Sequence, residues 1–340
     1  MKINWIQLIK TVLPLALGIY LIWIFFTGMS QKSLDTFYQA IREANYVWIV
    51  LALVMTITAC FSRAFRWKLL LEPLGYQSNF WNRYHAIMIG YLINMTIPRA
   101  GEASRAAMLY RSDGVPFSKG FGTIVAERAV DLFMLGSIAL FTFFLAAEDF
   151  KEILLQIKNR FSPVSSDGND TFFTWKVLLI ILILIVGIVI FLLWKKENWR
   201  QKLFQFIRGV WDGLLSIFKA KNPLLFAAHS LFIWALYVCY FWICFFSLDA
   251  TEDLPAKAIL LAFLAGSLGI MFTNGGIGTF PLLVGLVVVY YLGDEQPQAL
   301  AIGNAIGMLI WVSQTLFLIL LGLISLFLLP KNHQQKDVTT

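Results

Sequence analysis

Long apolar segments dominate this chain of 340 residues and restrict what it can fold into. The hydrocarbon core of a bilayer is about 30 Å thick and requires roughly 20 apolar residues of helix. The chain has 59 % hydrophobic and 14 % charged residues, against about 25 % charged residues in ordinary soluble domains. We therefore predict an all-α integral membrane protein. Six segments reach or approach the length of a full span: 12–28, 45–61, 121–147, 175–194, 223–246 and 298–328.

Two further apolar segments are interrupted where a plain membrane helix would continue. Residues 84–98 end in the sequence NMTIP, and residues 256–292 are broken by a stretch rich in glycine and proline at 274–281. Irregular backbone at membrane depth persists only where protein or a water-filled cavity satisfies its polar groups. We therefore expect two broken re-entrant hairpins, the first returning through residues 100–111, and each entering and leaving on one side of the membrane.

The distribution of positive charge favours these hairpins. Residues 195–222 form the most basic loop in the chain, and it would lie outside the cell if residues 84–98 simply crossed. Cytoplasmic loops normally carry the excess of Lys and Arg, so a first hairpin that returns is the better topology. Within the basic loop, residues 199–220 are predicted to form an amphipathic helix on the cytoplasmic interface.

The resulting topology divides the chain into two similar halves. Residues 12–147 and 175–328 each read span, span, hairpin, span, but they begin from opposite sides of the membrane. This is an inverted-topology repeat, which is typical of secondary transporters. The prediction is one membrane domain, 1–328, with six full spans and two broken hairpins, followed by a cytoplasmic tail at 329–340. The N-terminus is also expected in the cytoplasm.

Neither nucleic-acid binding nor enzyme chemistry is indicated. The net charge of +7 is attributed to loops that meet anionic lipid headgroups at the cytoplasmic face. The cysteines and histidines have no spacing typical of disulfides, metal sites or nucleophile motifs, so we expect no cofactor, no metal and no catalytic residues. The residues concerned are Cys60, Cys239, Cys244, His85, His229 and His333.

The sequence NMTIPRAGEASR at 94–105 is the strongest candidate site. Thr96 is expected to cap a new half-helix and Pro98 to lie in its first turn, so that the helix N-terminus forms an anion site within the membrane. Arg99 adds a forked guanidinium suited to phosphate, and Glu102 lies three residues from both arginines and is expected to orient them. The alternative is a cytoplasmic loop with solvated charges. The expected substrate-binding residues here are Asn94, Thr96, Pro98, Arg99, Gly101, Glu102 and Arg105.

Two other groups of residues are candidates for the same polar path. Glu127, Arg128 and Asp131 share one face of a helix, either as an interfacial ion pair or as a second wall of the headgroup site. A glycine-rich break is expected to line the cavity from the outer side, and it consists of Asn274, Gly275, Gly276 and Gly278. A basic cluster after the second span is interpreted as an interfacial anchor, with recruitment of lipid headgroups as the alternative. It consists of Arg63, Arg66 and Lys68.

At these residues the chain resembles a known family. The motifs are Pro98-Arg99-Ala100-Gly101-Glu102 with Arg105, then residues 114–119 (GVPFSK), then Glu127-Arg128 with Asp131-Leu132, and finally Gly275-Gly276-Ile277-Gly278. In order and type they are similar to those of the lysylphosphatidylglycerol synthetase transmembrane region, a flippase-like membrane family, over roughly residues 10–328.

The resemblance implies a lipid-translocating domain. In bifunctional members this region moves aminoacylated phosphatidylglycerol to the outer leaflet, whereas a soluble aminoacyl-transfer domain is expected to be missing here. The family usually has proline before the paired glycines and an acidic residue shortly after them. Here Asn274 and Pro281 occupy those places.

The expected function is therefore a flippase or lipid-linked transporter of the bacterial cytoplasmic (inner) membrane. Its substrate would have an anionic headgroup: a phospholipid, an aminoacyl-phospholipid or a polyprenyl-phosphate. The alternatives are a membrane-embedded transferase acting on a lipid or glycan, and a non-catalytic partner of such an enzyme. Besides the lipid, the expected partners are a second copy of the chain or a lipid-synthesis enzyme.

Overall fold

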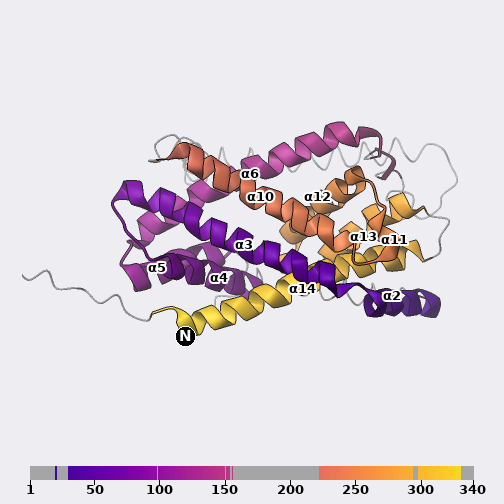
Figure 1. The fold of residues 1–340 in the computed structure, drawn as a ribbon, viewed down its shortest axis with the longest axis horizontal. Coiled ribbons are helices and arrows are strands. Elements are labelled where there is room, and N and C mark those ends of the chain that lie inside the picture. The colour runs from indigo at the N-terminus through magenta and orange to yellow at the C-terminus, as the bar shows by residue number, and fades with distance from the viewer. Residues whose placement is uncertain are drawn as a thin grey trace, which may run out of the picture.

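The computed structural model describes residues 20, 30–97, 99–149, 151–153, 155, 222–293 and 298–330. Within these ranges every regular element is a helix (Figure 1). Several predicted segments lie outside the described residues. They are most of the span 12–28, the span 175–194, the amphipathic segment 199–220 and the tail from residue 331.

Four helices are long and apolar enough to cross a membrane. They are α3 (Tyr46–Leu71), α6 (Phe117–Leu145), α10 (Pro223–Phe245) and α14 (Ala299–Leu328). Each one overlaps a predicted span. Large apolar side chains on their outer faces are exposed, as expected of a surface that meets lipid. Examples are Leu132, Phe133, Phe144, Leu316 and Phe327.

The predicted end of the second span is wrong. Residues after Phe61 were expected to lie in a cytoplasmic loop, but α3 continues unbroken to Leu71. The helix continues because its last turns are packed among α4, α6 and α10, so that the side chains of Arg63, Arg66 and Trp67 are buried within protein. The end of this predicted span therefore does not coincide with its first arginine.

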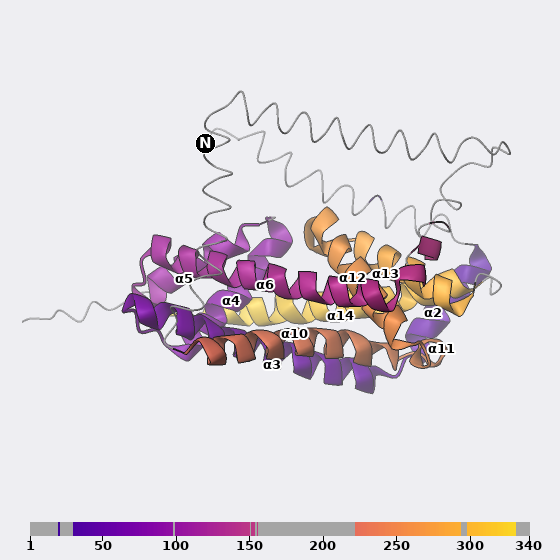
Figure 2. The ribbon, with the colours of Figure 1, turned by 90° about the horizontal axis from the view of Figure 1, so that it is seen from above.

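Two pairs of shorter helices form hairpins where the broken segments were predicted. The first consists of α4 (Phe80–Thr96) and α5 (Gly101–Asp113), and the second of α12 (Ala256–Phe272) and α13 (Thr279–Leu292). Figure 1 shows α4 and α5 near one end of the molecule and α12 and α13 towards the other. Figure 2 shows α3 and α10 side by side along one edge, with the hairpins on their inner side.

Helix α14 contacts both hairpins, and the contacts follow one another along its length. A Cβ built on Gly303 would lie 2.7 Å from the Gly285 carbonyl oxygen, and one on Gly307 would lie 2.8 Å from the Cα of Pro281. One turn further on, Trp311 Nε1 donates to the Gly275 carbonyl at 2.7 Å. Moving along α14, the contacts therefore pass from the middle of α13 to its start and then to the break.

The first hairpin contacts the later part of α14, and its tip points in the opposite direction along α14 to the tip of the second hairpin. A Cβ on Gly322 would lie 2.7 Å from the Leu92 Cβ, and the Ser325 hydroxyl pairs with His85 Nδ1 at 2.9 Å. The start of α4 therefore lies near the end of α14, and the end of α4 points towards the second hairpin. The two breaks meet, because a Cβ on Gly275 would lie 3.0 Å from the sulfur of Met95.

Glycine allows the two arms of each hairpin to approach closely. In the first hairpin, a Cβ on Gly101 would overlap the Gly90 carbonyl oxygen and lie 2.5 Å from the Asn94 side chain. In the second, a Cβ on Gly269 would lie 3.0 Å from the backbone nitrogen of Phe280. A larger residue would separate these backbones, so the glycines determine where each chain can turn back.

Candidate functional site

Five charged side chains are buried together where α3, α5 and α6 meet. Arg63 and Arg66 come from α3, Arg105 from α5, and Glu127 and Asp131 from α6, and none is more than 7 % exposed. Glu127 is ten residues into α6, so at 1.5 Å per residue it lies about 15 Å from the start of that helix. These residues are called the buried network below.

Asp131 holds both arginines of α3. Its Oδ2 accepts a hydrogen bond from Arg63 Nη2 at 2.9 Å, and its Oδ1 accepts one from Arg66 Nη2 at 3.0 Å. Arg66 also donates to the Ser230 hydroxyl at 3.1 Å, and its guanidinium lies 5.6 Å from the centre of the Phe226 ring. The network is therefore tied to α10 as well.

Arg105 is held by a carboxylate and an aromatic ring. Its Nη2 donates to Glu127 Oε2 at 2.9 Å, and its guanidinium carbon lies 4.3 Å from the centre of the Trp67 ring. Trp67 is fixed in turn by a 2.8 Å hydrogen bond from its Nε1 to the Thr123 hydroxyl. Stacking and one ion pair thus fix the plane of the guanidinium.

The buried network contains more positive than negative charge. Three guanidinium groups face two carboxylates within it, and arginine stays protonated in proteins. Several of its buried polar atoms have no hydrogen-bond partner among the described residues, although Arg66 Nε and Glu127 Oε1 lie 3.6 Å apart as an ion pair. These atoms are Arg63 Nε, Arg66 Nε, Arg105 Nε, Arg105 Nη1 and Glu127 Oε1.

Glu102 and Arg128 lie at the edge of the network. Arg128 Nε is 3.6 Å from Glu102 Oε1, and its Nη1 is 3.8 Å from Asp131 Oδ2. Their side chains are 27 % and 41 % exposed, respectively, so this pair lies between the surface and the buried arginines.

The start of α5 differs from the prediction in its details. The helix begins at Gly101 with Ala100 as the N-cap residue, instead of a cap at Thr96. The Gly101 N–H donates to the Asn94 side-chain oxygen at 2.7 Å, so α4 satisfies one of the N–H groups at this helix start. Thr96 is the last residue of α4, and Pro98 lies outside the described residues.

Arg99 and Arg105 do not share Glu102. Arg99 is exposed and has a φ of 62°, a left-handed conformation that is uncommon for a residue with a side chain. Glu102 pairs with Arg128, and Arg105 pairs with Glu127. Of the predicted site residues, the structure brings Glu102, Arg105, Glu127, Arg128 and Asp131 together.

The predicted glycine site lies at the break of the second hairpin. Gly275, Gly276 and Gly278 all have positive φ, between 66° and 82°, which explains the choice of glycine at this turn. Asn274 begins the short 3-10 turn η2 (Asn274–Gly276). This group faces the tip of the first hairpin through Met95 and Gly275, and it is a second group separate from the buried network.

Arg63 and Arg66 were predicted to be part of an interfacial basic cluster and not of the site. Only Lys68 of that basic cluster behaves as expected, with a side chain 49 % exposed and paired with Glu72 at 3.3 Å. The spacing of the charged residues within each helix could have indicated the network. Arg63 and Arg66 are three residues apart on one helix, and Glu127 and Asp131 are four apart on another, so each pair shares a face.

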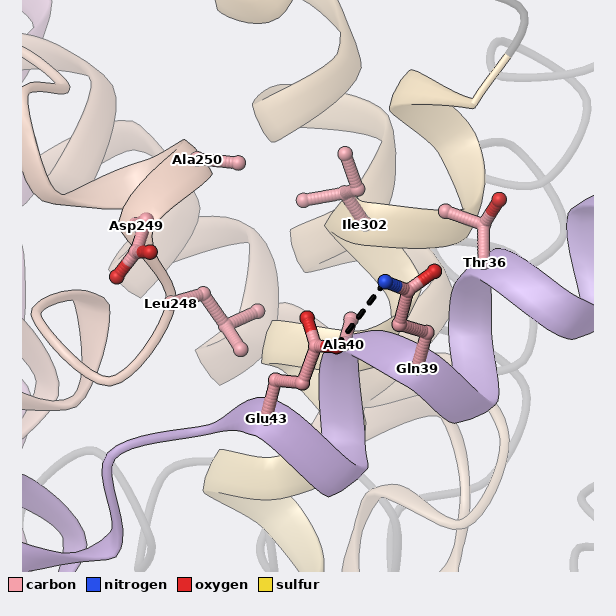
Figure 3. Close-up of a pocket in the computed structure, with 8 residues that line it drawn as sticks. All are labelled: Thr36, Gln39, Ala40, Glu43, Leu248, Asp249, Ala250 and Ile302. Atoms are coloured by element: carbon pink, nitrogen blue, oxygen red, sulfur yellow. Dashed lines mark hydrogen bonds between the residues drawn. The ribbon is translucent and has the colours of Figure 1, made fainter.

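A pocket at the other end of the molecule has the wrong charge for an anion. This cavity of about 200 Å³ lies between α2 (Gln31–Glu43), α11 (Asp249–Glu252) and α14 (Figure 3). Its lining includes the carboxylates of Glu43 and Asp249, and Gln39 donates to Glu43 at 3.0 Å. None of its lining residues is basic.

Comparison with known proteins places the chain in a family. The family described as the lysylphosphatidylglycerol synthase TM region matches residues 11–322. This chain belongs to that family. The match runs through α3, the first hairpin, α6 and the second hairpin, and so includes the buried network and the breaks of both hairpins.

Individual relatives are archaeal membrane proteins of the UPF0104 group. One from Methanocaldococcus jannaschii is 31 % identical over 119 residues, which is 34 % of each chain. One from Methanothermobacter thermautotrophicus is 22 % identical over 274 residues, 74 % of this chain and 77 % of the relative. The glycosyltransferase AglD of Haloferax volcanii is 29 % identical over 98 residues, 28 % of this chain and 16 % of the relative. No solved structure gives a significant match.

Proposed function

We propose that this protein moves a lipid with an anionic headgroup across the cytoplasmic membrane. The observation that carries the proposal is the excess of positive charge in the buried network, where Arg105 Nε and Nη1 have no acceptor among the described residues. A phosphate bound at the network would supply the missing negative charge and the missing acceptors. The proposed substrates are a phospholipid, an aminoacyl-phospholipid or a polyprenyl-phosphate.

The physical argument is the free energy of burying charge. An uncompensated charge removed from water is strongly destabilising, whereas a charge that is paired and hydrogen-bonded is tolerated. The planar fork of arginine matches two oxygens of a phosphate, and charge-assisted hydrogen bonds of this kind are the strong ones. The same groups that destabilise the empty site would therefore bind an oxyanion.

The edge pair Glu102–Arg128 supports a route from the bilayer to the network. Its half-exposed position lets a headgroup exchange for Glu102 on Arg128 before it reaches Arg105. The acyl chains would stay in the lipid while only the headgroup passes through the protein. Arg99, at the start of α5, is proposed to attract the phosphate to this opening.

The arrangement along α14 supports two re-entrant hairpins of opposite orientation. Their breaks meet at Met95 and Gly275, and each hairpin extends towards a different end of α14. We propose that each hairpin belongs to one half of an inverted repeat, with the predicted spans 12–28 and 175–194 completing the halves. Both termini are then cytoplasmic, and α4 and α5 enter from that side.

Reconstitution into liposomes with labelled lipids tests the proposal. The informative variant is the double substitution Arg105→Gln with Glu127→Gln, because it removes the ion pair without leaving either charge alone. The matched control is Lys68→Gln, since Lys68 is an exposed cation of α3 that lies outside the buried network and pairs with Glu72. Thermal melting in detergent establishes that each variant is folded.

The wild type and Lys68→Gln are expected to move an anionic lipid between leaflets, and the double variant is expected to lose that movement. A zwitterionic lipid without excess negative charge should move more slowly in the wild type. Equal leaflet exchange in all three proteins would contradict the assignment of the site.

A second copy of the chain is also proposed as a partner. Measuring the particle mass of the same preparations tests whether the protein forms a homo-oligomer.

A second candidate function follows from one comparison. The match to a glycosyltransferase over 98 residues supports a membrane-embedded transferase, or a non-catalytic partner of one, as the second candidate. In that case deletion of this chain would reduce the abundance or activity of a glycan or lipid synthase, while pure liposomes would show no lipid movement. Product formation by the purified chain alone would instead indicate a transferase.

A further inference from the structure

Two buried hydrogen-bond donors on α3 and α10 lack acceptors beside the buried network. Trp234 of α10 is 8 % exposed, and its Nε1 has no partner among the described residues. Arg63 of α3 is 3 % exposed, and its Nε is unpartnered in the same part of the chain. Because buried donors are normally hydrogen-bonded, each of these N–H groups indicates an acceptor that the described residues do not supply.

The position of Trp234 on α10 directs its ring towards the network. It lies four residues after Ser230, whose hydroxyl accepts from Arg66 at 3.1 Å, and residues four apart share a helix face. Helical side chains lean towards the N-terminus of their helix, so the Trp234 ring covers the turn that contains Ser230. The centre of this ring lies 5.8 Å from that of Tyr237, and Tyr237 interacts electrostatically with Arg63.

A tyrosine of the first hairpin lies at the same place. Tyr91 of α4 interacts electrostatically with both Arg63 and Arg105. The neighbouring Gly90 packs against Arg105, since a Cβ built on it would lie 2.6 Å from Arg105 Cγ. Tyr91 and Tyr237 are half-buried, and neither hydroxyl is hydrogen-bonded to another described residue. Four residues are called the inner group below: Arg63, Tyr91, Trp234 and Tyr237.

The charge of the buried network restricts what the inner group can bind. Three guanidinium groups face two carboxylates, so a phosphodiester with a single negative charge would balance the network. Its two free oxygens match the two unpartnered nitrogens of Arg105. A second anion would be buried without compensation, so the acceptors at the inner group are expected to be neutral oxygens. An ammonium group does not fit, because it has only N–H donors and would be repelled by Arg63.

We propose that the inner group binds a neutral polyol joined to the phosphate of the lipid, such as glycerol or a sugar. A hydroxyl both accepts and donates hydrogen bonds. The polyol would accept from Arg63 Nε and Trp234 Nε1 and donate to the hydroxyl oxygens of Tyr91 and Tyr237. This inference rests on the proposed function, since it takes the phosphate to lie at Arg105. It narrows the substrate to a phosphodiester with a polyol headgroup and disfavours headgroups that carry an amine.

Titration calorimetry of the full-length protein in detergent tests this specificity without any variant. The first probe is dihexanoyl phosphatidylglycerol. The second is dihexanoyl phosphatidylmethanol, which has the same charge and the same ester carbonyls but no polyol. The wild type is expected to bind the first about tenfold more tightly, the order expected of one or two neutral hydrogen bonds. A glucosyl phosphate of a ten-carbon prenol shows whether a sugar or glycerol is the preferred polyol.

Three substitutions each remove one polar group from the inner group. Trp234→Phe, Tyr237→Phe and Tyr91→Phe should each weaken the binding of phosphatidylglycerol by about threefold or more and leave that of phosphatidylmethanol unchanged. The control Tyr110→Phe removes an exposed hydroxyl from α5 and should change neither. Melting temperatures should stay near the wild-type value, because Trp234 Nε1 has no partner among the described residues to lose.

The outcomes separate this inference from the proposed function. Equal binding of the two dihexanoyl lipids by the wild type would overturn the polyol site, and so would the absence of binding of both. Equal loss of both lipids in all three variants would also overturn it. If lipid moves in liposomes without a preference for the polyol, the proposed function stands and the polyol site fails. If the preference is measured but no lipid moves, the polyol site stands and the proposed transport fails.

Discussion

Arg105 donates one hydrogen bond to Glu127 at 2.9 Å, yet its Nε and Nη1 are buried with no acceptor among the described residues. One end of the guanidinium is thus fixed by protein while the other is free. Stacking on Trp67 at 4.3 Å keeps that free end in one plane. Under the proposed function, these two nitrogens are the donors that would bind the phosphate.

Arg105→Lys should show whether lipid movement depends on the planar guanidinium or only on its positive charge. Lysine keeps the positive charge beside Glu127 but lacks the planar fork. We expect lipid movement to fall by about tenfold or more, since a hydrogen bond to a charged group contributes roughly 1.5–3 kcal/mol. Melting temperature should change far less than in Arg105→Ala. Transport equal to that of the wild type would mean that the fork is not used.

Asp131→Asn should be strongly destabilising. Asp131 is the carboxylate that holds Arg63 and Arg66, and breaking a buried pair typically costs about 3–5 kcal/mol. Asp149→Asn is the matched control, because the side chain of its partner Lys257 is 41 % exposed and such pairs contribute about 0–1 kcal/mol. Thermal melting of both variants measures the difference. Similar melting temperatures would contradict the burial of the network.

Gly101→Ala should disrupt the first hairpin. The new Cβ would overlap the Gly90 carbonyl, and backbone cannot move aside as a flexible side chain can. Overpacking of this kind typically costs about 1–3 kcal/mol. Gly136→Ala is the control, since nothing lies within 4 Å of a Cβ at that helical glycine. Yield and melting temperature should fall for the first variant and stay at the wild-type level, or rise, for the second.

A cross-link should join the two breaks. In a variant lacking the native cysteines, Met95→Cys with Gly275→Cys is expected to be joined by a short thiol-specific linker, because the two residues are in contact. Met95→Cys with Gly293→Cys is the control. Gly293 also has a positive φ, but a Cβ there meets nothing within 4 Å, and it lies at the far end of α13. Equal cross-linking of both pairs would show that the breaks do not meet.

Labelling with a membrane-impermeant maleimide should show that the first hairpin enters and leaves on the same side of the membrane. Single cysteines at Leu74 and Lys119 flank the first hairpin, and both residues are exposed. If the hairpin is re-entrant, both cysteines react from the same side of the membrane. Asp253→Cys, beyond α10, should react from the opposite side. Reaction of Leu74→Cys and Lys119→Cys from different sides would mean that the first hairpin crosses.

Local signals were sufficient to predict much of the fold. The lengths of the apolar runs predicted α3, α6, α10 and α14, because a membrane span needs a minimum number of apolar residues. Proline and glycine clustered at 97–101 and 274–281 predicted the breaks, since such clusters disfavour a continuous helix. Both signals depend only on neighbouring residues.

The buried network could not be predicted in this way. Arg63 and Arg66 follow an apolar run, which is equally typical of an interfacial anchor. Their partner Asp131 is more than sixty residues away, and only the packing of α3 against α6 brings them together. The same holds for Asn94, whose side chain satisfies the start of α5 once Gly90 and Gly101 are in contact.

The glycines of α14 have a mechanical consequence. Gly303 and Gly307 touch the backbone of the second hairpin, and Gly322 touches α4 of the first. Because α14 has no side chain at these three positions, its backbone packs closely against both hairpins. A tilt of α14 about its midpoint would therefore press on one hairpin while relieving the other, so the positions of the two hairpins are mechanically linked.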